Sequence, residues 1–378
     1  MKIVYCIEGT YNSGGMERVL ANKANYLANL GHKVFIITSD QQGRNPFFAL
    51  QTTIRSEDLD INYTDNNGKN LINKLLYYPG KIRRHKKRLT GVLMRLKADI
   101  VISMFCNDVS FITKIPDGSK KVLEIHFSKF KRLQYGRKGL WRLADRIRNK
   151  MDERIVRKFD RFVVLTHEDK SYWGDLPNME VIANAKNEWG HHTALLATKQ
   201  VIAVGRFTYQ KGYDRLIEAW RLVHERFPEW KLNIIGDGEL RNDMQRQIDS
   251  YRLEEVIELK MSASDILSEY IDASLLVLSS HYEGLPMVLL EAMSVGLPIV
   301  AFECKCGPKD LITNGVEGFL VSEGDVEGLA KQMMCLMADA QLRRNMGQAA
   351  QAKSEQYSEP VIMAKWLKLF DNLLEAKA

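Results

Sequence analysis

The chain opens with a β-branched segment, a glycine loop, a helical pattern and a second β-branched segment. KIVYCIE (residues 2–8) predicts a strand, and MERVLANKANYLANLG carries apolar residues at helical spacing up to Gly31. VFIITS (residues 34–39) predicts the next strand. Two strands joined through a helix lie parallel in one sheet, so this opening constrains the chain to an α/β fold.

The same alternation continues along the chain and then begins a second time. Further strands are predicted at residues 98–104, 120–126 and 161–166, and a second series runs from residue 200 to residue 321. A chain of 378 residues is long enough for two domains. We therefore expect two doubly wound α/β domains and a C-terminal amphipathic helix, over residues 1–186, 187–358 and 359–378. Ligands of such sheets bind at the carboxyl ends of the strands.

HYEGLPMVLLEAMSVGLPIVAF (residues 281–302) carries two glutamates, Glu283 and Glu291, among apolar neighbours. Pro286 favours a helix start, so a helix is expected over about residues 287–295. Both carboxylates and the free N–H groups of the first helical turn can then flank one pocket. Such a pocket suits a nucleotide sugar. The alternative is that Glu283 caps the helix and Glu291 faces solvent, although a carboxylate buried without a partner is costly.

Several segments resemble the retaining glycosyltransferases of family 4, which have the GT-B fold. EGLPMVLLE resembles their Glu-x7-Glu signature, and AVGRFTYQKGYDRLIEAW resembles their Gly-Arg-x4-Lys-Gly phosphate segment. NSGGMERVLANKANYLANLGHKV resembles the N-terminal glycine loop with its helix, EIHFS the segment with a donor-contacting histidine, and CGPKDLITNGVEGFLV the segment after the signature helix. The resemblance covers nearly the whole chain. It implies two Rossmann-like domains facing a cleft, with the C-terminal helix crossing back to the N-terminal domain.

The resemblance also implies roles for individual residues. Glu291 would accept hydrogen bonds from the ribose hydroxyls, and Glu283 would bind hydroxyls of the transferred sugar. Arg206 and Lys211 would neutralise the diphosphate as it leaves, and His126 would hydrogen-bond the donor sugar near the reacting carbon. Gly14 and Gly15 would let backbone N–H groups approach the diphosphate. Backbone amides would also be offered by Gly284, Leu285, Pro286 and Met287.

Each of these residues also has a structural interpretation. Arg206 and Lys211 can be solvated surface charges, Gly14 and Gly15 can form an ordinary turn, and His126 can be a satisfied core histidine. These alternatives stay open from the residues alone, and the resemblance favours the functional interpretation.

Charge separation suggests the mechanism. Cleavage of the sugar–phosphate bond builds negative charge on the nucleoside diphosphate, which fixed cations stabilise. In the front-face path usually proposed for the resembled family, the leaving phosphate oxygen takes the acceptor's proton. EDLD (residues 57–60) is expected in a loop rather than at a strand end, so we expect no metal and no cofactor. The resemblance favours a UDP-linked hexose or N-acetylhexosamine as donor, with GDP-mannose as the open alternative.

The formal net charge of +7 is unevenly distributed. Residues 69–97 contain ten Lys or Arg and no acid, and residues 120–158 contain fourteen Lys or Arg and four acids. Basic segments with interleaved aromatic and aliphatic residues can lie on an anionic membrane surface. The resemblance favours a membrane over nucleic acid, since such enzymes commonly extend lipid-linked glycans at the inner leaflet. A merely solvated face is the remaining alternative.

Bulk features narrow the class of protein. No secretory signal and no run long enough for a membrane span is recognised, and five scattered cysteines indicate free thiols. We expect a cytoplasmic enzyme, peripheral at the inner face of the membrane. The competing functions are a nucleotide-sugar 2-epimerase on the same architecture and a non-catalytic protein that binds membrane or nucleic acid.

Overall fold

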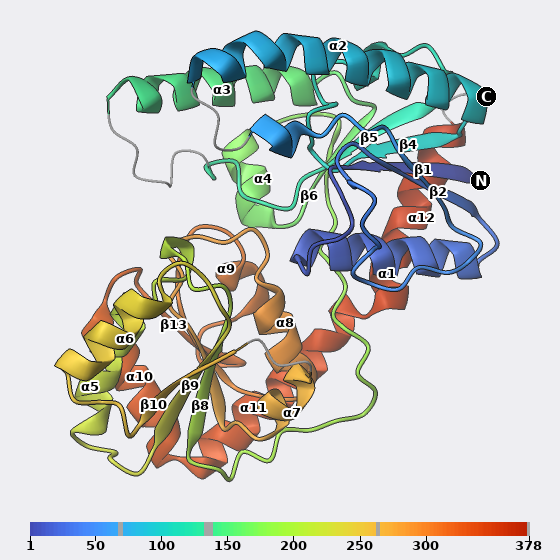
Figure 1. Ribbon diagram of the computed structural model, residues 1–378. Coiled ribbons are helices and arrows are strands. Elements are labelled where there is room, and N and C mark those ends of the chain that lie inside the picture. The colour runs from blue at the N-terminus through green and yellow to red at the C-terminus, as the bar shows by residue number, and fades with distance from the viewer. Residues whose placement is uncertain (67–70, 132–138, 262–264, 376–378) are drawn as a thin grey trace. The chain divides into compact units, whose positions relative to one another are not determined.

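The computed structural model describes the chain apart from residues 67–70, 132–138, 262–264 and 376–378. The described chain divides into two compact units (Figure 1). The first unit holds Met1–Leu165, Lys170–Ile182 and Met363–Ala378, and the second unit holds Thr166–Asp169 and Ala183–Ile362. The chain enters the second unit a few residues before the expected boundary at 186, and its C-terminal helix returns to the first unit a few residues after 359.

The segment Thr166–Asp169 belongs to the second unit although it lies within the range 1–186 expected for the first domain. Its polar groups explain this exchange. The N–H of His167 donates to Asp310 Oδ1 at 2.7 Å, and the N–H of Cys306 donates to Glu168 Oε2 at 2.9 Å. These bonds join residues far apart in sequence, so local patterns give no sign of them.

A seven-stranded parallel sheet forms the centre of the first unit, in the order β3-β2-β1-β4-β5-β6-β7. Its strands are β1 (Lys2–Ile7), β2 (Lys33–Thr38), β3 (Arg55–Asp58), β4 (Ile100–Ser103), β5 (Lys120–Glu124), β6 (Arg161–Val164) and β7 (Met179–Val181). Most of these strands are buried runs of Val, Ile and Leu, as expected for a sheet covered on both faces. The order reverses between β1 and β4, which marks a binding position in doubly wound sheets.

Helices cover both faces of this sheet (Figure 1). They are α1 (Gly15–Asn29), α2 (Leu71–Leu96), α3 (Leu140–Val156), α4 (His167–Trp173) and α12 (Glu359–Glu375). The core on the α2 and α3 side includes Leu89, Leu93 and Phe162, all fully buried. On the other face, α1 meets α12 through Lys23 and Trp366.

The prediction that residues 57–60 lie in a loop is wrong for part of this segment. Arg55–Asp58 forms the edge strand β3, because its backbone pairs with β2 although its side chains are exposed. Asp60 therefore follows a strand end. Charged side chains protect such an edge from pairing with other chains.

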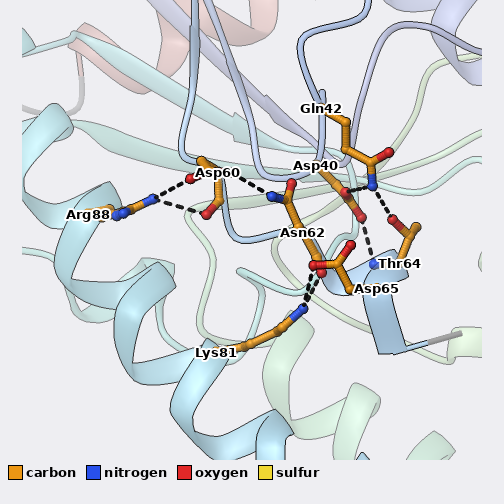
Figure 2. A network of polar contacts seen from close by, with 8 residues as sticks. All are labelled: Asp40, Gln42, Asp60, Asn62, Thr64, Asp65, Lys81 and Arg88. Atoms are coloured by element: carbon orange, nitrogen blue, oxygen red, sulfur yellow. Dashed lines mark hydrogen bonds and ion pairs between the residues drawn. The ribbon is translucent and has the colours of Figure 1, made fainter. Parts of the chain in front are cut away.

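A polar network fixes the loops after β2 and β3 to helix α2 (Figure 2). Asp40 accepts hydrogen bonds from Gln42 Nε2 and from the N–H of Thr64, both at 2.8 Å. Arg88 of α2 lies 3.7 Å from Asp60, and Lys81 of α2 lies 3.5 Å from Asp65. These contacts lie on the face of α2 that turns toward the protein.

A six-stranded parallel sheet forms the centre of the second unit, in the order β10-β9-β8-β11-β12-β13. Its strands are β8 (Gln200–Val204), β9 (Lys231–Ile235), β10 (Ile257–Lys260), β11 (Leu275–Leu278), β12 (Ile299–Phe302) and β13 (Gly318–Val321). The order reverses between β8 and β11. The prediction of two doubly wound α/β domains is confirmed.

The helices of the second unit pack on this sheet around a core that includes Trp220 and Phe302. They are α5 (Tyr213–His224), α6 (Arg241–Ser250), α7 (Ile266–Ile271), α8 (Met287–Ser294), α9 (Pro308–Leu311), α10 (Val326–Ala338) and α11 (Ala340–Ser354). Among the described residues of the whole chain, no helix has the length and apolar character needed to cross a membrane.

Candidate functional site

The predicted residues Lys211 and Glu283 meet where the strand order of the second sheet reverses. Lys211 ends a short 3-10 turn (Tyr209–Lys211) in the connection from β8 to α5, and Glu283 lies between β11 and α8. Lys211 Nζ lies 2.8 Å from Glu283 Oε1. Because β8 and β11 are neighbours, their carboxyl ends bring these residues together although they are far apart in sequence.

Glu283 is a buried carboxylate with several donors. Besides Lys211, Ser280 Oγ donates to Oε1 at 2.6 Å and Gln210 Nε2 lies 3.4 Å from Oε2. The Glu283 residue is only 6% exposed. A buried charge is tolerated when it is paired and hydrogen-bonded, and both conditions hold here.

Two glycines make room for this pair. A Cβ on Gly205, the residue after β8, would lie 2.7 Å from Lys211 Cε and 2.9 Å from the Tyr213 hydroxyl. Gly212 has a φ of +58°, and a Cβ there would overlap the backbone carbonyl of Ser279. The local backbone therefore requires glycine on both sides of Lys211.

Burial raises the pKa of Tyr213 well above its usual range, and the charge of Glu283 raises it further. Its hydroxyl is buried and has no hydrogen-bond partner among the described residues. Tyr213 is therefore a neutral phenol that helps to enclose the charged pair.

Glu291 lies on α8, is only 6% exposed and has partners of its own. Asn187 Nδ2 donates to Oε1 at 2.8 Å, and the Tyr270 hydroxyl donates to Oε2 at 2.8 Å. The ring of Trp189 lies 5.5 Å from that of Tyr270. The alternative of a solvent-facing Glu291 is wrong.

Glu283 does not cap α8, because Pro286 is the N-cap residue and no side chain accepts a capping hydrogen bond there. Of the residues expected to donate backbone amides, Gly284, Leu285 and Met287 carry an N–H, but Pro286 does not. Including Pro286 among the amide donors was a mistake of chemistry. Within the described chain, no acceptor is recorded for the N–H of Gly284 or of Leu285.

Within the second unit, the side chain of the predicted residue Arg206 is not part of the Lys211–Glu283 ion pair. Arg206 follows Gly205 and is exposed, and among the described residues its side chain forms no ion pair. Nearby, the rings of Tyr209 and His281 stack at 4.2 Å with an angle of 13°. Burial lowers the pKa of His281, and Arg215 lowers it further.

The predicted residues of the first unit lie after β1 and after β5. Gly14 is the N-cap residue of α1 and Gly15 is its first residue, with open space where a Cβ of Gly15 would be. His126 follows β5, and its Nε2 lies 3.2 Å from Glu124 Oε1. The Nδ2 of Asn12 lies 3.4 Å from Glu17 Oε1 beside the start of α1.

Sequence reasoning missed the side chains that hold the two glutamates. Ser280 and Gln210 are close to motif residues, so their positions beside Glu283 and Lys211 were a usable signal. Asn187 and Tyr270 come from segments with no recognisable pattern, and only the folded chain brings them to Glu291.

The basic segments 69–97 and 120–158 are described only in part, since residues 69–70 and 132–138 lie outside the described residues. Among the described residues of α2, six cations are exposed: Arg83, Arg84, Lys86, Lys87, Arg88 and Arg95. Of these, Arg88 and Arg95 pair with Asp60 and Glu57. In α3, Ile147 and Met151 are each 53% exposed and stand among exposed cations, namely Arg146, Arg148 and Lys150.

Two family models match the chain. The model described as "Glycosyl transferases group 1" matches residues 191–353, and the model described as "Glycosyltransferase Family 4" matches residues 13–187. The first range covers the Lys211–Glu283 pair with Glu291, and the second covers Gly14, Gly15 and His126.

Two relatives align with the chain over almost their whole length. The chain is 30% identical over 386 residues to the amylovoran biosynthesis glycosyltransferase AmsD of Erwinia amylovora, covering 97% of this chain and 98% of the relative. It is 26% identical over 386 residues to a Campylobacter jejuni enzyme, with 100% of both chains covered. That enzyme is named GalNAc-alpha-(1->4)-GalNAc-alpha-(1->3)-diNAcBac-PP-undecaprenol alpha-1,4-N-acetyl-D-galactosaminyltransferase.

A solved structure has the same fold. A mutant of S. aureus TarM in complex with fondaparinux, alpha-GlcNAc-glycerol and UDP gives a TM-score of 0.79 at 18% identity, covering 98% of this chain and 99% of that chain. This structural likeness shows the fold. The family models and the full-length relatives show the family. The chain therefore belongs to the family 4-like glycosyltransferases with the GT-B fold.

Proposed function

We propose that this glycosyltransferase moves a hexosyl or N-acetylhexosaminyl group from a UDP-sugar to a glycan or lipid-linked acceptor, with retention of anomeric configuration. The observation that carries the proposal is the buried Lys211–Glu283 pair at the reversal point of the second sheet. Glycan synthesis is supported by the amylovoran enzyme, and a lipid-linked acceptor by the C. jejuni enzyme. UDP is supported by its presence in the TarM complex.

In the proposed reaction, Lys211 stabilises the diphosphate as the sugar–phosphate bond breaks. Its ammonium group is held by Glu283, so it is positioned before the donor arrives and needs little reorganisation. Arg206 is exposed and free to move toward the second phosphate. Glu283 Oε2 binds hydroxyls of the transferred sugar in this proposal, and among the described residues its hydrogen-bond donor is Gln210 Nε2 at 3.4 Å.

Glu291 holds the nucleoside in this proposal. Its carboxylate accepts hydrogen bonds from Asn187 and Tyr270, which hold it in a fixed orientation toward the ribose hydroxyls in this proposal. The amides of Gly284 and Leu285 supply donors for the anionic part of the ligand. Lys211 and Arg206 supply the positive charge that a metal ion supplies to the diphosphate in other transferases, so we propose that no metal is required.

We further propose that the first unit contacts an anionic membrane through the exposed cations of α2 and α3. Lys81, His85 and Arg88 of α2 turn toward the protein, two of them within the network of Figure 2. Arg83, Arg84, Lys86 and Lys87 lie on the remaining face and are exposed. On α3, Ile147 and Met151 add apolar contact area among cations.

The test is turnover and thermal shift with UDP-glucose, UDP-galactose, UDP-GlcNAc, UDP-GalNAc and GDP-mannose, each with and without EDTA. A bound donor stabilises the fold in proportion to the logarithm of its concentration over its dissociation constant. We expect one UDP-sugar to bind and turn over equally with EDTA, and the product to keep the anomeric configuration by NMR. An inverted product or loss of turnover in EDTA contradicts the mechanism. Release of a 2-epimer without transfer would identify an epimerase.

A further inference from the structure

Lys23, Glu124 and His126 form a buried charged cluster in the first unit. Lys23 Nζ lies 2.7 Å from Glu124 Oε1 and 2.6 Å from Oε2, and His126 Nε2 lies 3.2 Å from Oε1. The three side chains are 6%, 1% and 7% exposed. Replacing such a buried ion pair by apolar residues often costs no stability, so stability alone does not explain the cluster.

Backbone geometry directs Glu124 and His126 toward each other. Glu124 is the last residue of β5, and the N–H of Ile125 donates to the carbonyl of Val163 at 3.1 Å. Side chains two residues apart on extended backbone lie on the same face of the sheet. The histidine and its carboxylate partner therefore come from one short, fixed segment.

The other side of the cluster is closed by the C-terminal helix. Lys23 Nζ, on α1, lies 3.6 Å from the ring centroid of Trp366 on α12 and 5.6 Å from that of Tyr5 on β1. Trp366 is 1% exposed. A cation over the face of Trp is attracted to it, so the return of α12 to the first unit fixes Lys23 and, through it, Glu124.

Glu124 is ionised in this setting. Burial alone raises its pKa, but Lys23 and His126 outweigh burial and lower the pKa to about 2. An ionised carboxylate only accepts hydrogen bonds, so it favours a proton on the ring nitrogen that faces it. The distance from His126 Nε2 to Glu124 Oε1 is 3.2 Å, but the N–H does not point at the oxygen well enough to form a hydrogen bond. Hydrogen bonds of catalytic groups commonly tighten when substrate binds.

We propose that Glu124, anchored by Lys23 and Trp366, is a positioning residue that fixes His126 with its proton on Nε2 and leaves Nδ1 to accept a hydrogen bond from the donor sugar. The role of Nδ1 rests on the proposed function. The tautomer of His126 does not, since it depends only on Glu124.

Two variants test the proposal. Glu124→Gln keeps the shape of the side chain but leaves the Lys23 charge buried without a carboxylate, which can prevent folding. The double variant Lys23→Met/Glu124→Gln removes both charges and keeps His126. The matched control is Glu180→Gln, since Glu180 on β7 of the same sheet is 43% exposed and lies 3.5 Å from Arg161.

The first readout is NMR of the full chain labelled with 15N-histidine, which contains eight histidines. The His126 signal is assigned by its loss in His126→Asn. We expect the wild type and Glu180→Gln to show the Nε2–H tautomer, and the double variant to show a mixture of tautomers. An unchanged tautomer in the folded double variant overturns the proposal, whatever the enzyme's donor.

The second readout is steady-state turnover of the donor. We expect the double variant to lose at least about tenfold in kcat, as for other partners that orient a histidine. The donor KM should stay within about twofold, because the cluster orients a reacting group and adds no uniform binding. Unchanged kcat in the double variant overturns the positioning role. If the wild type turns over no donor, the proposed function fails and the tautomer result still decides this proposal.

Discussion

Lys211 Nζ lies 2.8 Å from Glu283 Oε1, and this ion pair joins the two strand ends between which the second sheet reverses its order. Both side chains are largely buried, with 14% and 7% exposure. The pair places a cation and a carboxylate in one small polar site whose surroundings are fixed by glycine backbone. A cation beside a carboxylate suits the phosphate and hydroxyl groups of the proposed donor.

Lys211→Met is expected to lower kcat by about 10²–10³-fold, the usual cost of removing a preorganised group that stabilises charge in the transition state. Donor turnover by the folded variant measures this loss. The control is Lys199→Met, because Lys199 is 59% exposed and pairs with Glu229 on the surface. Equal activity of the two variants would remove Lys211 from the site.

Tyr270→Phe is expected to weaken donor binding by about tenfold, because one hydrogen bond to a carboxylate contributes at least about 1.5 kcal/mol. Glu291→Ala should weaken donor binding far more, since it removes the carboxylate itself. Calorimetric titration with the active donor measures both dissociation constants. If Glu291→Ala binds as tightly as Tyr270→Phe, then Glu291 does not contact the nucleoside.

Most strands of the fold are predictable from sequence because they are buried apolar runs. Several observed ladders are shorter than predicted, as in Ile100–Ser103 against 98–104, since buried residues such as Ala98 and Met104 continue past the last ladder pair. The edge strand Arg55–Asp58 was missed because backbone pairing, and no apolar pattern, defines it.

The site is predictable only where a motif marks it. Glu283 and Glu291 stand out as carboxylates among apolar neighbours, whereas Lys211 was found through family resemblance, because periodicity carries no information on which distant residues meet. Lys23 was missed since a lysine within an amphipathic helix normally faces water. Its partner Glu124 lies far along the chain at the end of β5, and the burial of both is a property of the folded chain.

Gly212→Ala is expected to destabilise the protein by more than about 2 kcal/mol. A non-glycine residue at positive φ costs about 1–2 kcal/mol, and the added methyl would also overlap the carbonyl of Ser279. Gly31→Ala is the matched control, because Gly31 has a φ of +82° with open space around its Cβ position. Urea denaturation measures the loss of unfolding free energy in both variants. The difference between the two losses is the cost of the overlap with Ser279, since both variants carry the backbone strain. Equal losses would show that the Ser279 carbonyl moves aside.

Neutralising the exposed cations of α2 is expected to release the protein from anionic vesicles. Each Lys or Arg near such a surface contributes about 1 kcal/mol. The variant changes Arg83, Arg84, Lys86 and Lys87 to Gln, and co-sedimentation with phosphatidylglycerol vesicles measures binding. The control changes four exposed cations of the second unit to Gln: Arg226, Arg246, Lys331 and Arg344. Equal binding by both variants would contradict a membrane role for α2.

Asp108→Asn is expected to stabilise the first unit near neutral pH. Asp108 is buried after β4 with Ser103 Oγ 3.0 Å from Oδ1, and its Oδ2 has no partner among the described residues. Burial raises its pKa from 3.8 to about 6, although the Ser103 hydrogen bond opposes the rise. The protonated form is therefore favoured by folding, and its stabilising effect is complete below about pH 4 and is lost as the pH rises through about 6.

The stability difference between Asp108→Asn and wild type should grow in favour of the variant by roughly 2.5 kcal/mol from pH 4 to pH 7.5. Asparagine keeps an oxygen for Ser103 and carries no charge, so its own stability should not vary through titration of this position. Urea denaturation at several pH values measures the difference, with the exposed Asp175→Asn as control. A difference that stays constant with pH would mean that water or a cation satisfies Oδ2 in the folded protein. In that case, the small cavity beside it, lined by Cys6, Ser39 and His85, holds that partner.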